Sequence, residues 1–243
     1  MPAANQNAPT RQQERREATV NEIKRRSREQ IARNGPGALS LRAVARDMRV
    51  SSAAIYRYFP SHADVITTLC IDTYNDLADT VNATRGATEK QQPAERMWAV
   101  FESVRTWALT HPSDFTLIFG TPIPGYKAPE EETTAAAARL ASSIVKTYAE
   151  AAAAGVVDLA VVEVPKQNTQ GDLGSRLTAE QPSAPAEISA GALFGWTSVI
   201  GFISTELWGN LGRIVTTTDS AFDAYLRSVL RTMGFHPEAL PDA

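Results

Sequence analysis

The sequence predicts an all-α protein with a small N-terminal domain and a larger C-terminal one. In its long segments, apolar residues recur three and four positions apart, which is the period of an amphipathic helix. Between those segments Gly, Pro, Asn and Ser gather and mark turns and loops. A chain of 243 residues is ample for a sizeable core and accommodates one or two domains.

Charge is unevenly divided along the chain, whose formal net charge is -3. Residues 1–60 carry 12 Lys or Arg against 5 Asp or Glu, a net +7, and the remaining residues carry a net -10. Such asymmetry indicates a part of the molecule that faces nucleic acid. The alternative is that the N-terminal helices are simply exposed, because exposed helices are often rich in arginine.

The N-terminal residues 1–15 are polar and rich in Gln, Asn and Pro, so we expect them to form a flexible arm. A helix is predicted from residue 16 to residue 34. One face of that helix carries Val20, Ile23, Ser27 and Ile31. The sequence Asn-Gly-Pro-Gly at residues 34–37 supplies the usual chemistry for ending a helix.

Residues 40–60, SLRAVARDMRVSSAAIYRYFP, read as two short helices joined by a tight turn. Ser40 is a candidate N-cap for the first helix. The apolar face of this helix consists of Leu41, Val44, Ala45 and Met48. The first helix should end near Arg49, because Val50 is β-branched and two further candidate caps, Ser51 and Ser52, would start a second helix in a new direction.

This pattern is typical of a helix-turn-helix, which places the first residues of its second helix in the major groove of DNA. The small residues at that position, with one arginine after them, are candidates for contacts to base edges: Ser51, Ser52, Ala53 and Arg57. Phenolic and imidazole donors nearby are candidates for phosphate contacts: Tyr56, Tyr58 and His62. Ser40 and Arg42 are further predicted DNA-binding residues. The alternative is an ordinary pair of packed helices with solvated arginines.

Residues 16–69, and especially LRAVARDMRVSSAAIYRYFPSHADVI, resemble the N-terminal domain of the tetracycline-repressor (TetR) family of transcriptional regulators. The resemblance implies a three-helix helix-turn-helix DNA-binding domain over residues 16–62. A C-terminal helical domain for ligand binding and dimerisation would follow over residues 63–236. The family usually carries a lysine two residues after the proline, where this chain has His62. That phosphate contact is therefore expected to be weaker and pH-dependent.

Further helices are predicted behind the DNA-binding segment, over residues 61–83, 93–111, 113–119, 130–154, 186–209 and 219–234. The stretch 155–185 has little periodicity and much Gly, Pro, Gln, Asn and Ser, so we expect a long loop there. An exception within it is the apolar, β-branched run at residues 156–164.

Aromatic side chains are concentrated in this C-terminal part, with few charged residues among them. Such a composition is typical of pockets for small apolar or aromatic ligands. The predicted ligand-binding residues are Trp98, Phe101, Trp107, Phe115, Phe119, Tyr126, Tyr148 and Trp196. Because aromatic residues at helical spacing are more often plain core, that alternative stays open.

The segment 186–209 is apolar over most of its circumference, which is more apolar surface than the outer helix of a monomer needs. Paired with the last helix it would form a four-helix bundle across a two-fold axis, the way the TetR family dimerises. The predicted interface residues are Leu193, Trp196, Ile200, Ile203, Leu207, Phe222, Tyr225 and Val229. HPSDFTLIFGTPIPGY and LFGWTSVIGFISTELWG also resemble a C-terminal subgroup named for a Trp-His-Gly signature, with Ile200 in the place of its histidine.

Enzyme chemistry has no sequence signature here: there is no glycine-rich phosphate loop, nucleophile elbow or metal-ligand cluster. No cofactor or metal is expected, and the single cysteine, Cys70, is expected to be a buried structural thiol. Without an apolar run of membrane-spanning length or a signal peptide, we expect a cytoplasmic protein without a membrane partner.

The prediction for the whole chain is a ligand-responsive regulator, a repressor, that binds a palindromic double-stranded DNA operator as a homodimer. A small apolar or aromatic effector would release it from that operator. The alternative is a helical enzyme or an activator with a degenerate DNA-binding head.

Overall fold

The computed structural model describes residues 10–162 and 185–241, and within these ranges the chain is helical and contains no strand. Its α-helices are α1 Arg11–Asn34, α2 Leu41–Asp47, α3 Ser52–Tyr56, α4 His62–Ala87, α5 Pro93–Thr110, α6 Pro112–Phe119, α7 Glu130–Ala153, α9 Ala186–Leu207 and α10 Thr218–Thr232. Short 3-10 turns are η1 Pro36–Ala38, η2 Leu159–Val161, η3 Leu211–Arg213 and η4 Pro237–Ala239. The predicted all-α class is confirmed.

Backbone contacts divide the chain into two compact units. The first consists of Met1–Cys70 and Thr121–Ala128, and the second of Ile71–Gly120 and Pro129–Ala243. The division falls after Cys70, within α4, and not after His62, where the sequence placed the domain boundary. The segment 121–128 belongs to the first unit, although the sequence assigned it to the C-terminal domain.

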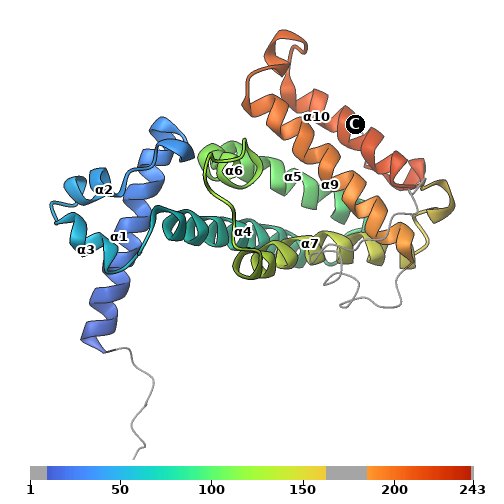
Figure 1. Cartoon of the computed structure of the whole chain (residues 1–243). Coiled ribbons are helices and arrows are strands. Elements are labelled where there is room, and N and C mark those ends of the chain that lie inside the picture. The colour runs from blue at the N-terminus through green and yellow to red at the C-terminus, as the bar shows by residue number, and fades with distance from the viewer. Residues whose placement is uncertain (1–9, 163–184, 242–243) are drawn as a thin grey trace, which may run out of the picture. The chain divides into compact units, whose positions relative to one another are not determined.

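In the first unit, α1, α2 and α3 form the helix-turn-helix domain (Figure 1). Their shared core consists of apolar side chains that are at most 4% exposed: Ile23, Ile31, Leu41, Val44 and Ile55. Burying each of them contributes roughly 1.5–3 kcal/mol. These positions are the ones that the helical period of the sequence assigned to the interior, so the local prediction of this domain is confirmed.

Helix α1 begins at Arg11, five residues before the predicted start. The backbone N–H of Gln13 donates to the Thr10 hydroxyl at 3.3 Å, and the Gln13 side chain accepts from the Thr10 N–H at 2.7 Å. This reciprocal pairing is a capping box, which satisfies two of the backbone donors that a helix start leaves free. The prediction of a flexible arm is therefore wrong for residues 11–15, and residues 1–9 lie outside the described ranges.

Serine caps and a left-handed turn define the two short helices. The Ser40 hydroxyl accepts from the Ala43 N–H at 3.4 Å, and the Ser51 hydroxyl accepts from the Ala54 N–H at 3.3 Å. Between the helices, Arg49 adopts a φ of 57°, a conformation that glycine usually takes at the end of a helix. These contacts fix the direction in which α3 leaves α2.

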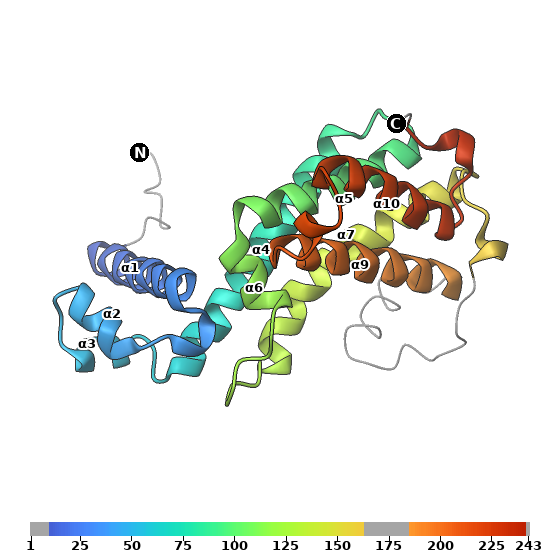
Figure 2. The ribbon, with the colours of Figure 1, turned by 90° about the horizontal axis from the view of Figure 1, so that it is seen from above.

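The second unit is built on α5, whose inward side chains Met97, Val100, Phe101 and Val104 are fully buried. Helix α9 lies beside α10 in both views (Figures 1 and 2). Close approach of α9 to its neighbours requires glycine. A Cβ added to Gly191 would lie 2.7 Å from the Tyr148 ring, and one added to Gly195 would lie 2.4 Å from the Met233 sulfur.

A buried arginine joins α5 to both of these helices. Arg105 donates to the two carboxylate oxygens of Glu206, at the end of α9, over 2.8 and 2.6 Å. It also donates to Asp219, in the first turn of α10, over 2.7 Å, and its guanidinium lies 4.8 Å from the centre of the Phe222 ring. The ends of α9 and α10 are thereby held on α5.

After α7, the apolar run predicted at residues 156–164 forms a single antiparallel bridge, Val157 to Phe235, and no strand among its described residues. Asp158 N–H donates to the Gly234 carbonyl at 2.8 Å, and His236 N–H donates to the Val156 carbonyl at 3.0 Å. The rest of the predicted loop, residues 163–184, lies outside the described ranges.

Helix α9 is long and apolar enough, by composition alone, to cross a membrane. One of its sides lies in the core of the second unit, where Ile188, Val199 and Ile203 are at most 2% exposed. A core helix of a globular domain passes the same test of length and composition.

Candidate nucleic-acid interface

The short helix α3 presents its start and one side to solvent. Ser51, Ala53, Tyr56 and Arg57 are exposed, and Tyr56 retains 44% of its accessible surface. On the opposite side, Ile55 is 1% exposed and holds the helix on the core. The predicted base-contacting residues therefore lie together on an accessible surface, with Ser52 half-buried among them.

The remaining predicted DNA-binding residues differ in exposure. Ser40 and Arg42 are exposed, but Tyr58 is half-buried, and the Arg16 guanidinium lies 5.5 Å from the centre of its ring. His62 opens α4 with its Nε2 atom buried and without a hydrogen-bond partner among the described residues. Only the other ring nitrogen of His62 is left to reach a phosphate.

A groove on the same unit brings together basic residues of α1 and the end of the helix-turn-helix. It lies between the first turns of α1 and the end of the helix-turn-helix, and is lined by Arg11, Gln12, Arg15, Arg16, Thr19, Arg57 and Tyr58. The capping pair Thr10 and Gln13 is the sequence signal that would place Arg11, Gln12 and Arg15 on a helix. Apolar periodicity does not reveal this helix start, because the surrounding residues have no apolar period.

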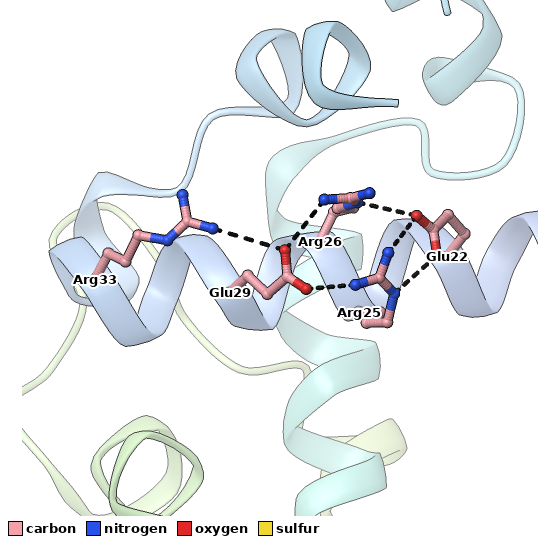
Figure 3. Close-up of polar contacts among 5 residues, drawn as sticks. All are labelled: Glu22, Arg25, Arg26, Glu29 and Arg33. Atoms are coloured by element: carbon pink, nitrogen blue, oxygen red, sulfur yellow. Dashed lines mark hydrogen bonds and ion pairs between the residues drawn. The ribbon is translucent and has the colours of Figure 1, made fainter. Parts of the chain in front are cut away.

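Farther along α1, three arginines pair with two glutamates of the same helix (Figure 3). Arg25 donates to Glu22 at 2.6 Å and also pairs with Glu29, and Arg26 bonds the same two carboxylates. Arg33 lies 3.7 Å from Glu29. The hydrogen bonds from Arg25 and Arg26 lower the pKa of Glu22 to about 2, so the Glu22 carboxylate stays charged and the network of three arginines and two glutamates persists.

Four of the predicted ligand-binding residues are closed core. Phe101, Trp107, Phe115 and Tyr148 are at most 4% exposed. Trp107 donates its indole N–H to Asp76 at 2.7 Å, and the Tyr148 hydroxyl donates to the Met233 carbonyl. These contacts favour plain core for the four residues, because every ring is packed and the polar atoms of Trp107 and Tyr148 are already bonded.

Three other aromatic residues, Trp98, Phe119 and Trp196, are half-buried at the edge of this core. The Phe119 ring lies 5.6 Å from the Trp196 ring and 5.2 Å from the Phe115 ring. Tyr126 does not join them: it lies in the first unit, where its hydroxyl is 3.0 Å from the Thr67 hydroxyl. Its assignment to the same pocket is wrong, because residues 121–128 pack with the DNA-binding unit.

The predicted dimer residues separate into two groups. Ile203, Phe222 and Val229 are at most 4% exposed within the single chain, so their assignment to an interface is wrong: their apolar surface is already covered. Leu193 and Tyr225 are 58% and 36% exposed, and Trp196, Ile200 and Leu207 are half-buried. Two exposed side chains that the sequence analysis did not name, Phe194 and Trp208, lie on the same helix or at its end.

Two family models match the chain. "Bacterial regulatory proteins, tetR family" covers residues 23–68, and "Tetracyclin repressor-like, C-terminal domain" covers residues 97–229. The HTH-type transcriptional regulator Rv1816 of Mycobacterium tuberculosis is 33% identical over 221 residues, which span 90% of this chain and 93% of that protein. The HTH-type transcriptional regulator Mb1846 of Mycobacterium bovis matches to the same extent.

Solved structures of regulatory proteins also match the chain. The regulatory protein SCO4313 aligns with a TM-score of 0.71 at 31% identity, covering 92% of this chain and 100% of that one. A regulatory protein of the tetR family from Rhodococcus RHA1 aligns with a TM-score of 0.59 at 14% identity, covering 89% and 97%, and this second likeness shows the fold alone.

The matching families and relatives are transcriptional regulators and not enzymes. The exposed α3, the basic unit that carries it and a relative that is 33% identical over 90% of this chain lead to one assignment. The chain belongs to the TetR family of DNA-binding transcriptional regulators.

Proposed function

We propose that the protein is a cytoplasmic repressor that binds a palindromic operator as a homodimer and releases it when a small apolar or aromatic effector binds. The observation that carries the DNA-binding part is the exposed surface of α3. Ser51, Ala53, Tyr56 and Arg57 are accessible there, on a unit whose first 60 residues have a net charge of +7.

The proposed dimer rests on the outward side of α9 and α10. Leu193, Phe194, Gly201 and Trp208 are all exposed, at spacings that return to one side of a helix, and Tyr225 lies beside them. The Tyr225 hydroxyl donates to the Ser198 carbonyl at 3.2 Å, which keeps α10 against α9. A second copy of the chain, related by a two-fold axis, would remove this apolar surface from water.

The proposed effector site is the aromatic edge formed by Phe119 and Trp196, with Trp98 on α5 as a further candidate. Such residues favour an apolar or aromatic ligand, because removal of apolar surface from water contributes about 25 cal/mol per Å². The regulator RolR, a fold neighbour at 15% identity and a TM-score of 0.53, was crystallised with resorcinol. That likeness concerns the fold, so the proposal rests on the aromatic side chains of this chain.

The mechanism is a shift between two populations of the dimer. A dimer competent for DNA holds its two copies of α3 in successive major grooves, about 34 Å apart. An effector that binds better to a dimer with another spacing must weaken DNA binding, and DNA must weaken effector binding by the same factor.

The experiment that tests this proposal is a fluorescence titration of duplex DNA at several salt concentrations. Affinity should fall steeply with salt, because each phosphate contact releases counterions. Tyr56→Phe should weaken binding to all sequences, whereas Ser52→Ala and Arg57→Ala should change which sequence is preferred. A flat salt response would remove the support for the DNA-binding proposal.

A further inference from the structure

Two arginines and one glutamate meet where three helix ends of the second unit come together. Arg85 lies in the last turn of α4, Arg96 near the start of α5 and Glu150 near the end of α7. Arg85 donates to Glu150 Oε1 at 3.0 Å, and Arg96 Nη2 lies 3.3 Å from Glu150 Oε2. The arginine side chains are only 14% and 16% exposed, so the cluster is mostly withdrawn from water.

The charges of this cluster do not balance. Among the described residues, the ion pairs of Arg85 and Arg96 go to Glu150 alone, so two cations face one carboxylate. The nearby Glu95 is engaged elsewhere, because its carboxylate accepts from the Gln92 N–H at 3.2 Å. A charge that is largely removed from water is costly unless it is paired. The cluster therefore favours one further negative charge.

The hydrogen bonds of this cluster are incomplete as well. The Nε–H groups of Arg85 and Arg96 are buried and have no hydrogen-bond partner among the described residues. In each guanidinium, Nη2 faces Glu150 while the neighbouring Nε–H is unused. A buried donor without an acceptor is destabilising. Oxygen acceptors beside these two donors would remove that penalty.

Arg105 shows how a similar arginine in the same unit is completed. Its Nε and Nη2 groups both donate to Glu206, and Asp219 adds a second carboxylate at 2.7 Å. One cation there faces two carboxylates, and its fork of donors is filled. Around Glu150 the ratio is reversed. The unused donors are therefore a property of this cluster and not a general consequence of burying arginine in this unit.

We propose that Arg85 and Arg96 form an anion-binding site, which takes the carboxylate or phosphate group of a small metabolite. Its oxygens accept from the Nε–H and Nη2–H groups of both arginines, whose planar forks match such groups. The Glu150 carboxylate, which bridges the two arginines, turns outward to admit the anion. The site goes beyond the proposed function, because it takes a charged group and shares no residue with the aromatic edge of Phe119 and Trp196.

The test is isothermal titration calorimetry of the full-length protein with inorganic phosphate and, separately, with succinate. Sodium chloride keeps the ionic strength constant, and the two probes distinguish a phosphate ligand from a carboxylate ligand. The variants are Arg85→Gln, Arg96→Gln and Glu150→Gln. The chain offers matched controls in Arg139→Gln and Asp79→Asn, because Arg139 and Asp79 form an exposed ion pair between the same two helices, α7 and α4.

We expect saturable binding of at least one probe to the wild-type protein. Arg85→Gln and Arg96→Gln should each weaken it at least about tenfold, since each removes charge-assisted hydrogen bonds. Both control variants should stay within about twofold of wild type, because an exposed pair contributes little. Absence of saturable binding of both probes would overturn the proposal and leave water as the occupant. An equal loss in Arg139→Gln would also overturn it, because any basic residue would then serve.

Glu150→Gln keeps the test independent of lost folding. Removing the competing carboxylate should tighten binding of the anion at least about threefold, and unfolding cannot produce such a gain. Unchanged or weaker binding would contradict the role assigned to Glu150.

Arg85→Lys separates charge from hydrogen-bond geometry. It keeps the positive charge but loses the fork, so it should bind at least about threefold less tightly. Affinity equal to wild type would refute the proposed use of the Nε–H group. Circular dichroism of each variant shows whether the helices are retained. No DNA enters these measurements, so their outcome is independent of the proposed operator binding.

Discussion

Removal of the buried Arg105 should destabilise the protein far more than removal of its exposed partner Asp219. The Arg105 and Glu206 side chains are 10% and 7% exposed, and two hydrogen bonds of 2.8 and 2.6 Å join them. Arg105→Met would leave the Glu206 carboxylate buried without its cation. Breaking such a pair by removing one partner costs about 3–5 kcal/mol, a large part of the 5–15 kcal/mol typical of a folded protein.

The other partner provides a matched control. Asp219 also bonds Arg105, over 2.7 Å, but its side chain is 86% exposed. Solvent screens such a contact, so Asp219→Asn should cost under about 1 kcal/mol. The double variant Arg105→Met/Glu206→Leu removes both buried charges and should recover at least about half of the loss, because apolar replacements of a buried pair are often close to neutral.

Urea unfolding followed by circular dichroism, at one fixed protein concentration because a dimer is proposed, gives these free energies by linear extrapolation. Burial alone would raise the pKa of the Glu206 carboxyl, but the hydrogen bonds from Arg105 and Thr218 and the charge of Arg105 together outweigh it, and the net shift is downward. The stabilisation is therefore present above the ordinary pKa near 4.5 and is lost as the pH falls below it. A loss under about 1 kcal/mol for Arg105→Met, or no recovery in the double variant, would refute this reasoning.

Two further predictions concern the dimer and the segment 121–128. Leu193→Glu, at an exposed apolar position on α9, should give monomers in sedimentation. The control Leu109→Glu, at an exposed apolar position on α5, should leave the dimer intact. If Leu193→Glu also remains a dimer, the two-fold axis lies elsewhere. Tyr126 hydrogen-bonds the side chains of Thr67 and Cys70, and burial raises the pKa of the Cys70 thiol to about 11. The Tyr126 hydrogen bond lowers that pKa, so Tyr126→Phe should leave less thiolate and slow labelling of this single cysteine at least about twofold; labelling as fast as wild type would show that this contact does not act on the thiol.

Local rules predicted the helices of this chain well. Ser40 and Ser51 cap their helices as expected, and the inward residues of α5 and α7 follow the 3.6-residue period. The start of α1 escaped prediction because a capping box among polar residues carries no apolar period. Arg49 in the turn is another such case, since its left-handed backbone depends on the packing of α2 against α3.

These local rules do not predict how the helices pack against one another. Helix α9 is apolar around most of its circumference, so periodicity cannot distinguish Ile203, which is covered by its own chain, from Leu193, which is exposed. The same limit applies to the aromatic residues, because Phe101 and Tyr148 share their spacing with residues at the edge of the core. Tyr126 was misplaced for a different reason: the sequence does not show that the loop after α6 packs with the DNA-binding unit.

The claim that α3 reads DNA sequence can be tested most directly by selection from a random duplex library. The wild-type protein should enrich an inverted repeat whose half-sites lie about one helical turn apart. The double variant Ser52→Ala/Arg57→Ala should keep salt-dependent binding but enrich a different or weaker motif, because phosphate contacts remain while base contacts are lost. Enrichment of the same motif by both proteins, or of none by the wild type, would contradict the claim.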